Sequence, residues 1–273
     1  MISHGKPTGT VLDKIVAGKR EALLKAQRDH PLADVRRAAE AAGPRSDFHA
    51  ALKGPGAHPG VSVITEMKRA SASAGSLAPD LDPSTMAKTF IDGGAAAISV
   101  LTEADHFSGS LEDLRQVKAV AGPRGIPVME KDFVFSEYQV YEAAANGADA
   151  VLLIIAILEQ DQYSDLLGLA RGLGLGVLVE VFNRPELETA LTENPRIIGI
   201  NNRNLKTLET DLSVFETLAP LVPRDRMLVA ESGMKGVEDV RRMQAAGAQA
   251  VLVGESLMRA GGSVSGLISS LSG

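Results

Sequence analysis

One unit recurs along most of this chain, and it constrains the fold more than any other feature. From Val61 onward, a short run rich in Val, Ile and Leu follows a Gly- or Ala-rich turn, ends in polar residues and leads into an amphipathic stretch. The eight apolar runs are 61–68, 96–103, 126–131, 148–154, 176–182, 196–202, 226–232 and 248–254. Between them, apolar residues at helical spacing predict helices such as those over 83–92, 136–146, 162–173 and 237–246.

This alternation predicts the fold class. Strands that alternate with helices form right-handed crossovers and a parallel sheet. Strands that are apolar on both faces fit a sheet that is covered on both sides. Eight units over roughly 210 residues match the usual size of a (β/α)8 TIM barrel. A doubly wound open sheet is the alternative, but no GxGxxG turn follows the first run. We therefore predict an α/β protein with a TIM barrel over residues 61–273.

The first sixty residues differ from the rest in charge and in pattern. They contain ten Lys and Arg against six Asp and Glu, a net charge of +4, whereas the whole chain of 273 residues carries −6. Helical apolar spacing predicts one helix that Thr10 can cap and a second over 32–42, and the stretch 54–60, rich in Gly and Pro, predicts a loop. We expect a helical extension over 1–60, whose basic side chains form either a solvated helix face or a positive lid that attracts an anion.

The composition excludes several classes of protein. Lys and Arg number 28 against 34 Asp and Glu, which does not support a nucleic-acid partner or a polybasic membrane anchor. The chain has no Cys, which excludes disulfides, thiol catalysis and zinc–thiolate sites. It has no apolar run long enough to span a membrane and no apolar signal core at its N-terminus, so we expect a cytoplasmic protein. The five His show no HxH or HExxH spacing, so no metal site is expected.

Polar residues interrupt the apolar runs near their carboxyl ends, which is where the active site of a TIM barrel lies. Since side chains alternate along a strand, spacing in the sequence indicates which of them share a face. The residues predicted to converge at one rim are Glu66, Lys68, Lys131, Glu180, Asn201, Arg203 and Glu231. Lysines and carboxylates in a partly desolvated pocket shift one another's pKa values and suit general acid–base chemistry.

The residues alone leave the role of the lysines open. Lys131, next to apolar neighbours, fits a proton donor, and Lys131 or Lys68 also fits the Schiff-base nucleophile of a lyase or aldolase that acts on a phosphorylated sugar. Burial would raise the pKa of Glu180 and nearby lysines would lower it. A barrel that binds phosphosugars without catalysis is a further alternative, and it would not need the acidic residues.

The last two units carry a second signal. Ser232 and Gly233 follow the seventh run, and Gly254 and Glu255 follow the eighth and open a short helical piece. Backbone N–H groups of glycine-rich loops approach anions closely, and the loops after strands seven and eight are the usual phosphate site of this fold. The alternative is that these glycines only turn the chain. We predict a phosphate site at these loops.

Seven motifs in this order resemble the indole-3-glycerol phosphate synthase family. They are TEMKRASASAG (65–75), PVMEKDFV (127–134), ADAVLLIIAIL (148–158), LVEVFN (178–183), IIGINNRNL (197–205), VAESGM (229–234) and VLVGESLM (251–258). The resemblance implies that residues 1–60 cover the barrel mouth. It also implies a carboxy-lyase of tryptophan biosynthesis that needs no cofactor and no metal. Its substrate would be a phosphorylated small molecule, 1-(2-carboxyphenylamino)-1-deoxyribulose 5-phosphate, and its products indole-3-glycerol phosphate, CO2 and water. The sequence leaves a monomer and a homodimer open.

The resemblance implies a role for each candidate residue. Lys131 matches the general acid that protonates the ketone oxygen, and Glu180 the acidic residue paired with that step. Lys68 matches a lysine that contacts the anionic groups of the substrate and assists dehydration, and Glu66 is its carboxylate neighbour. Asn201 and Glu231 match residues that hold the substrate, and Arg203 one that meets the aryl carboxylate. The positions on the phosphate side are Ser71, Ser232, Gly233, Gly254 and Glu255. Apolar surroundings for the aryl ring would come from Phe107, Phe133, Leu152 and Ile154.

Four positions depart from the family pattern. Ala72 stands where proline is usual and Ala74 where a small or basic residue is common, which predicts a looser loop after the first strand. Glu130 replaces a frequent arginine, and Phe182 replaces a frequent histidine. By strand alternation Glu130 points away from Lys131, so we expect a minor effect on the chemistry.

Overall fold

The computed structural model describes residues 6–53, 60–71 and 75–272. Within these ranges eight parallel strands pair in the order β1-β10-β9-β8-β7-β6-β5-β4 and close into a barrel. The strands are β1 (Ser62–Met67), β4 (Ala97–Leu101), β5 (Val128–Lys131), β6 (Ala150–Ile154), β7 (Gly176–Val181), β8 (Ile197–Asn201), β9 (Met227–Glu231) and β10 (Ala250–Val253). Each predicted apolar run contains one of these strands, so the predicted TIM barrel is confirmed. The departures Ala72 and Ala74, and residues 54–59 of the predicted loop, lie outside the described residues.

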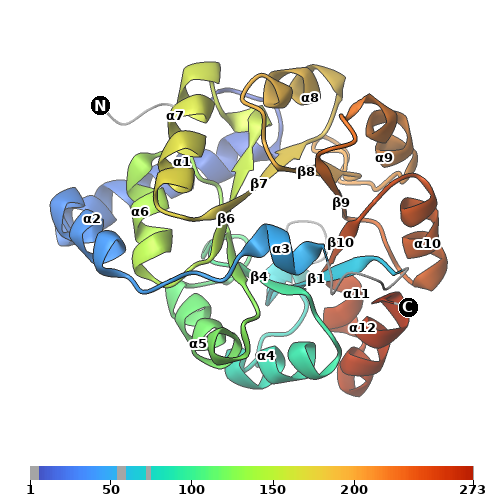
Figure 1. Ribbon diagram of the computed structural model, residues 1–273. Coiled ribbons are helices and arrows are strands. Elements are labelled where there is room, and N and C mark those ends of the chain that lie inside the picture. Colours follow the sequence, from blue (N-terminus) through green and yellow to red (C-terminus); the bar gives the residue numbers. More distant parts are fainter. Residues whose placement is uncertain (1–5, 54–59, 72–74, 273) are drawn as a thin grey trace.

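Helices surround the strands as a ring (Figure 1). They are α4 (Pro83–Asp92), α5 (Leu111–Ala121), α6 (Glu137–Ala145), α7 (Gln160–Gly172), α8 (Arg184–Leu191), α9 (Ser213–Leu218), α10 (Val237–Ala245), α11 (Glu255–Arg259) and α12 (Val264–Ser272). Short 3-10 helices extend the connections: η1 (Gly122–Arg124), η2 (Ile155–Ile157), η3 (Ala219–Leu221) and η4 (Gly261–Ser263). Several helices begin where a side-chain oxygen accepts a backbone N–H, as Asp82 does for α4 and Ser110 for α5.

The strand register brings polar residues together at one end of the barrel. Ile154 of β6 pairs with Glu180 of β7, and Asn201 of β8 pairs with Glu231 of β9. Between this polar end and the amino ends of the strands, the strand residues are apolar and buried on both faces of the sheet. All five residues of β6, for example, are buried. After β1 the chain forms a small antiparallel pair, β2 (Ala70–Ser71) with β3 (Gly75–Ser76). None of the helices described is both long and apolar enough to cross a bilayer.

The N-terminal segment forms three helices: α1 (Val11–Asp29), α2 (Leu32–Ala41) and α3 (Phe48–Leu52). Thr10 caps α1 as predicted, because its side chain accepts the N–H of Leu12. α2 packs against α6, and the Tyr138 hydroxyl of α6 lies 3.1 Å from the carbonyl oxygen of Ala26 and 3.0 Å from that of His30, to one of which it donates. These contacts hold the segment along the outside of the barrel.

α3 was not predicted, and it lies at the amino ends of the strands, opposite the polar rim. In Figure 1 it crosses the middle of the barrel. Phe48 is buried against the first residues of β6 and β7, and a Cβ on Gly176 would lie only 2.7 Å from the Cβ of Phe48. Next to it, the backbone N–H of Ser46 donates to the Asp149 carboxylate at 2.8 Å. The segment therefore contacts the barrel base as well as its side.

Candidate active site

A single pocket at the carboxyl ends of the strands collects most of the predicted residues. Besides the seven rim residues, it is lined by Ser71, Ser232, Gly254 and Glu255. Gly233 does not line it; this glycine has a φ of +89° and forms a turn with Ser232, whose φ is +63°. Three residues of α1, Val11, Leu12 and Ile15, also line the pocket. The helical spacing of these three predicted their helix but not their place in the pocket.

Lys131 stands at the centre of three carboxylates. Its Nζ lies 3.5 Å from Oε2 of Glu180 and 4.0 Å from Oε2 of both Glu66 and Glu231. The side chain is 15% exposed, so the ammonium group is largely withdrawn from water. Burial alone would lower the pKa of Lys131, but the charges of Glu180, Glu231 and Glu66 outweigh burial and raise it. The group is therefore a charged ammonium at neutral pH.

Glu66 and Lys68 form a second contact on the same face of β1. Lys68 Nζ donates to Oε1 of Glu66 at 2.5 Å. Burial favours the neutral acid, but the charges of Lys68 and Lys131 outweigh it and lower the pKa of Glu66. Glu66 is therefore an ionised bridge between the two lysines.

Glu231 differs from its neighbours. It is 1% exposed, and among the described residues neither carboxyl oxygen has a hydrogen-bond partner within normal limits. Burial raises the pKa of Glu231 well above its usual range, and the negative charge of Glu180 adds to this rise. The site thus places a buried carboxyl group with a raised pKa beside carboxylates that contact lysines, an arrangement suited to proton transfer.

Asn201 and Arg203 extend the site from Glu180 toward Glu255. Asn201 donates through Nδ2 to Oε2 of Glu180 at 3.2 Å, and it accepts the backbone N–H of Arg203 at 3.0 Å. The guanidinium of Arg203 donates to the carbonyl of Leu208 and lies 3.8 Å from the carboxylate of Glu255. The carboxylate of Glu255 is turned toward the guanidinium of Arg203. An anionic ligand would therefore contact the backbone of Glu255 rather than its negatively charged side chain.

Two glycines make room for the carboxylates. A Cβ on Gly254 would lie 2.4 Å from Oε1 of Glu66, and a Cβ on Gly199 would lie 1.9 Å from Oε1 of Glu231. Both positions therefore need a residue without a side chain. The sequence predicted Gly254 only as a phosphate contact and assigned no role to Gly199.

Gly199→Ala should therefore displace Glu231 and lower kcat/KM by about tenfold or more, since a shift of about 1 Å in a catalytic group is enough for such a loss. Steady-state kinetics of the purified variant measures this. The matched control is Gly168→Ala, because a Cβ at Gly168 would meet nothing within 4 Å. Equal activity of both variants would show that Glu231 tolerates displacement.

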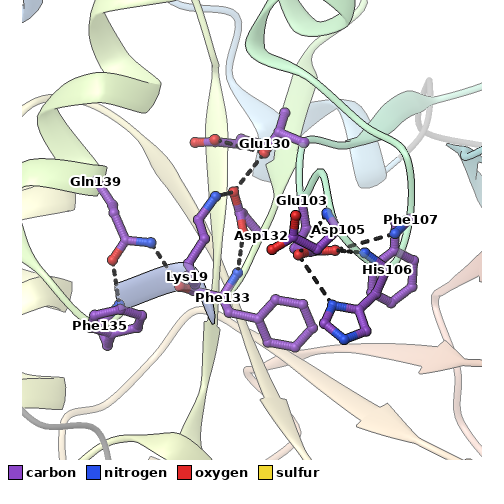
Figure 2. A network of polar contacts seen from close by, with 11 residues as sticks. Lys19, Glu103, Asp105, His106, Phe107, Glu130, Asp132, Phe133, Phe135 and Gln139 are labelled. Atoms are coloured by element: carbon purple, nitrogen blue, oxygen red, sulfur yellow. Dashed lines mark hydrogen bonds and ion pairs between the residues drawn. The ribbon is translucent and has the colours of Figure 1, made fainter. Parts of the chain in front are cut away.

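An apolar wall faces the charged groups. The rings of Phe107 and Phe133 lie 6.1 Å apart at an angle of 37°, and Leu152, Ile154 and Phe182 line the same pocket. Glu103 holds the loop that carries Phe107, because its carboxylate accepts the backbone N–H groups of Asp105, His106 and Phe107 (Figure 2). Such a wall suits an aromatic ring next to an anionic group.

Glu130 faces away from the pocket, as strand alternation predicted. It is absent from the pocket lining, and its Oε1 lies 2.9 Å from the hydroxyl of Thr102. Its neighbours include Asp132 and Lys19, so it belongs to a second cluster of charged groups beside the pocket (Figure 2). The sequence gave no sign of this cluster, because Lys19 and Thr102 lie 113 and 30 residues from Asp132 in the chain.

Comparisons with known proteins agree with this geometry. The family model for indole-3-glycerol phosphate synthase matches residues 12–266. An indole-3-glycerol phosphate synthase from Nocardioides sp. is 49% identical over 256 residues, which cover 92% of this chain and 94% of that protein. The indole-3-glycerol phosphate synthase from Desulfosudis oleivorans is 46% identical, covering 93% of this chain and 96% of its own.

Among solved structures, 3-hexulose-6-phosphate synthase from Salmonella typhimurium is similar with a TM-score of 0.60 at 11% identity, covering 77% of this chain and 96% of that chain. Thiamine phosphate pyrophosphorylase from Pyrococcus furiosus has a TM-score of 0.59 at 16% identity, with coverage of 77% and 93%. At these identities the likeness concerns the barrel fold alone.

Proposed function

The chain belongs to the indole-3-glycerol phosphate synthase family, and from this premise we propose which residues carry out the steps of the reaction. The enzyme is a carboxy-lyase of tryptophan biosynthesis that closes the indole ring of 1-(2-carboxyphenylamino)-1-deoxyribulose 5-phosphate. The aryl carbon attacks the ketone, the aryl carboxylate leaves as CO2, and water is lost, which gives indole-3-glycerol phosphate.

Lys131 is the proposed general acid of ring closure. The attack turns the ketone oxygen into an alkoxide, which is far more basic than an amine, so even a lysine with a raised pKa donates its proton. The three carboxylates around Nζ support this role, because they keep the lysine charged and fixed in place. This cluster is the observation on which the proposal rests.

Glu180 and Lys68 are the proposed partners in the later steps. Glu180, 3.5 Å from Lys131 Nζ, can stabilise the cationic intermediate and relay protons during dehydration. Lys68, paired with Glu66, is available to the anionic groups of the substrate and to the leaving hydroxyl. Arg203 would meet the aryl carboxylate, and Asn201 and Glu231 would hold the substrate.

The proposed phosphate contacts are Ser71, Ser232, Gly254 and Glu255. They line the same pocket as Phe107 and Phe133, so one ligand could present its phosphate to the first set and its aryl ring to the aromatic pair. Gly233 is proposed to act through the turn that it forms with Ser232. Loss of CO2 is favoured in the apolar part of the pocket, because a carboxylate is less stable there than in water.

The Schiff-base alternative finds less support in the site. Imine formation needs a neutral amine, whereas the carboxylates around Lys131 raise its pKa and keep it charged. Borohydride added with the substrate should therefore trap no covalent adduct. An adduct detected by mass spectrometry would favour the lyase or aldolase instead.

Product formation is the direct test of the proposed function. Because the chain has no Trp, its own emission will not mask the fluorescence of the indole product. Mixing the protein with the substrate should produce a rising indole signal. A flat trace from folded protein that binds the substrate would argue against the proposed activity.

The Glu180→Gln variant should lower kcat by about a hundredfold or more, because the amide neither relays protons nor carries the negative charge that faces Lys131. The same fluorescence assay measures the loss. The control is Glu188→Gln, since Glu188 is an exposed residue of α8 outside the pocket lining and pairs with Arg184. Unchanged activity of Glu180→Gln would favour a barrel that binds phosphosugars without catalysis.

We also propose that the enzyme works in the cytoplasm, as a monomer or homodimer without a nucleic-acid partner. Its place in a biosynthetic family and its net charge of −6 support this proposal. Analytical ultracentrifugation distinguishes the two oligomeric states.

A further inference from the structure

Four side chains, Lys19, Thr102, Glu130 and Asp132, form a chain of contacts beside the pocket, which Asp132 also lines; Figure 2 shows Lys19, Glu130 and Asp132 of this chain. Lys19 of α1 pairs with Oδ2 of Asp132, which directly follows β5. The hydroxyl of Thr102, just after β4, lies 2.9 Å from the same Oδ2 and 2.9 Å from Oε1 of Glu130. These contacts therefore connect Lys19 of α1 with Glu130, whose side chain lies on the face of β5 that points away from the pocket.

The two contacts of Thr102 cannot both be made with ionised carboxylates. A threonine hydroxyl has one hydrogen, which it can donate to one of the two oxygens. The other contact needs a second hydrogen, which only a protonated carboxyl can supply. One of the two acids is therefore neutral when this geometry is present.

The surroundings identify Glu130 as the neutral acid. Asp132 is ion-paired with Lys19 and also accepts the backbone N–H of Phe133 at 2.7 Å, so its negative charge is stabilised. Glu130 is 3% exposed, and its Oε2 has no hydrogen-bond partner among the described residues. If Glu130 were ionised, its buried Oε2 would have no hydrogen-bond partner and its charge would lie near the negative charge of Asp132. The protonated form of Glu130 is therefore the stable one.

The charged groups around Glu130 agree with this assignment. They are Asp132 of the same strand end, Lys19 of α1 and Glu142 of α6. Burial raises the pKa of Glu130 to about 8; the charge of Asp132 adds to this rise, and that of Lys19 opposes it. Glu130 would therefore lose its proton just above neutral pH.

We propose that Glu130 is a positioning residue that acts as a protonated acid: it donates to Thr102, which donates to Asp132, and Asp132 in turn holds Lys19 and thereby α1, called the lid here because three of its residues line the pocket. The helix places Val11, Leu12 and Ile15 in the pocket lining. Asp132 also fixes the backbone of Phe133, one side of the apolar wall. When Glu130 loses its proton, the Thr102 hydroxyl can donate to only one of the two carboxylates. The negative charges of Glu130 and Asp132 then lie beside each other. The lid and the wall then lose their fixed position.

The kinetic test varies pH between 6 and 9 and compares wild type with Glu130→Gln. The amide of glutamine donates to Thr102 at every pH, so the variant should keep a constant KM where the KM of wild type rises. The rise should be about two- to tenfold, the value of one hydrogen bond, with a smaller change in kcat. Thr102→Val removes the link and should raise KM already at pH 7. Glu137→Gln is the matched control, since it removes an exposed carboxylate of the same helix α6 that is outside the chain of contacts, and it should keep the wild-type profile.

A second measurement needs no substrate. A carboxyl whose pKa is higher in the folded state than in the unfolded state binds its proton more tightly when folded, so stability falls as pH rises from the unfolded value to about 8. The Tm of wild type should therefore fall between pH 6 and 9, and Glu130→Gln should reduce this fall.

The kinetic readout rests on the proposed function, whereas the Tm readout does not. A loss of Tm slope in Glu130→Gln without indole formation in wild type would contradict the function but keep the protonated acid. Equal Tm slopes in both proteins, or a KM of Glu130→Gln that rises with pH as in wild type, would overturn the inference.

Discussion

Lys131→Ala is expected to lower kcat for indole formation by about a thousandfold, which is within the range of a positioned general acid. The variant removes the proton donor and also leaves Glu66, Glu180 and Glu231 without the ammonium group that they surround. The alkoxide formed in ring closure then meets negative charge in place of a cation. Single-turnover fluorescence with saturating variant enzyme measures the loss at the chemical step.

Two controls separate this effect from a loss of fold or of binding. Lys206→Ala removes an exposed lysine from the loop after β8 and should leave kcat unchanged. Calorimetry with indole-3-glycerol phosphate shows whether Lys131→Ala still binds a ligand of the pocket. A variant that binds the product and turns over within tenfold of wild type would rule out Lys131 as the acid.

Asp149→Ala is expected to destabilise the fold by about 3–5 kcal/mol, the usual result of removing one partner of a buried ion pair. Asp149 is fully buried, and its carboxylate accepts from Lys118 Nζ at 2.6 and 2.7 Å. It also accepts the backbone N–H groups of Ser46 and Val128, each at 2.8 Å. Alanine would leave one charge and two backbone donors without their partner. Urea unfolding followed by circular dichroism measures the free energy.

An exposed ion pair provides the comparison for Asp149. Asp225 lies 3.4 Å from Arg226, but the Asp225 side chain is 70% exposed. Asp225→Ala should change the free energy of unfolding by less than about 1 kcal/mol, as exposed pairs do. If Asp149→Ala and Asp225→Ala lowered the free energy of unfolding equally, the buried contacts of Asp149 would stabilise the fold no more than an exposed ion pair does.

The barrel could be predicted from the sequence because its signals are local and repeated. Each strand is a short apolar run, and helices such as Pro83–Asp92 begin and end where spacing and capping residues indicate. α3 escaped prediction because five residues are too few to show a helical period. Its docking depends on Phe48 meeting Gly176, a contact that no local pattern carries.

The same division applies to the site. Alternation along the strands predicted that Lys131 and Glu180 share a pocket, because both lie at strand ends whose direction the fold sets. It did not predict that Gly199 makes room for Glu231, since that depends on side-chain packing between neighbouring strands. Nor did it predict the pairing of Lys19 with Asp132, which are 113 residues apart in the chain. Local pattern therefore indicated which residues reach the pocket, and tertiary packing decided what else they touch.

The position of α3 at the barrel base has a consequence for synthesis on the ribosome. Ser46 and Arg45 are made early, but their partners Asp149 and Leu173 follow 103 and 128 residues later. Until β6 and β7 emerge, Phe48 lacks the residues against which it is buried, so the nascent chain carries this apolar side chain exposed until residues 150–176 have been made. The residues of α3 are thus synthesised well before the barrel residues on which they dock, so the docking of this helix has to wait for β6 and β7.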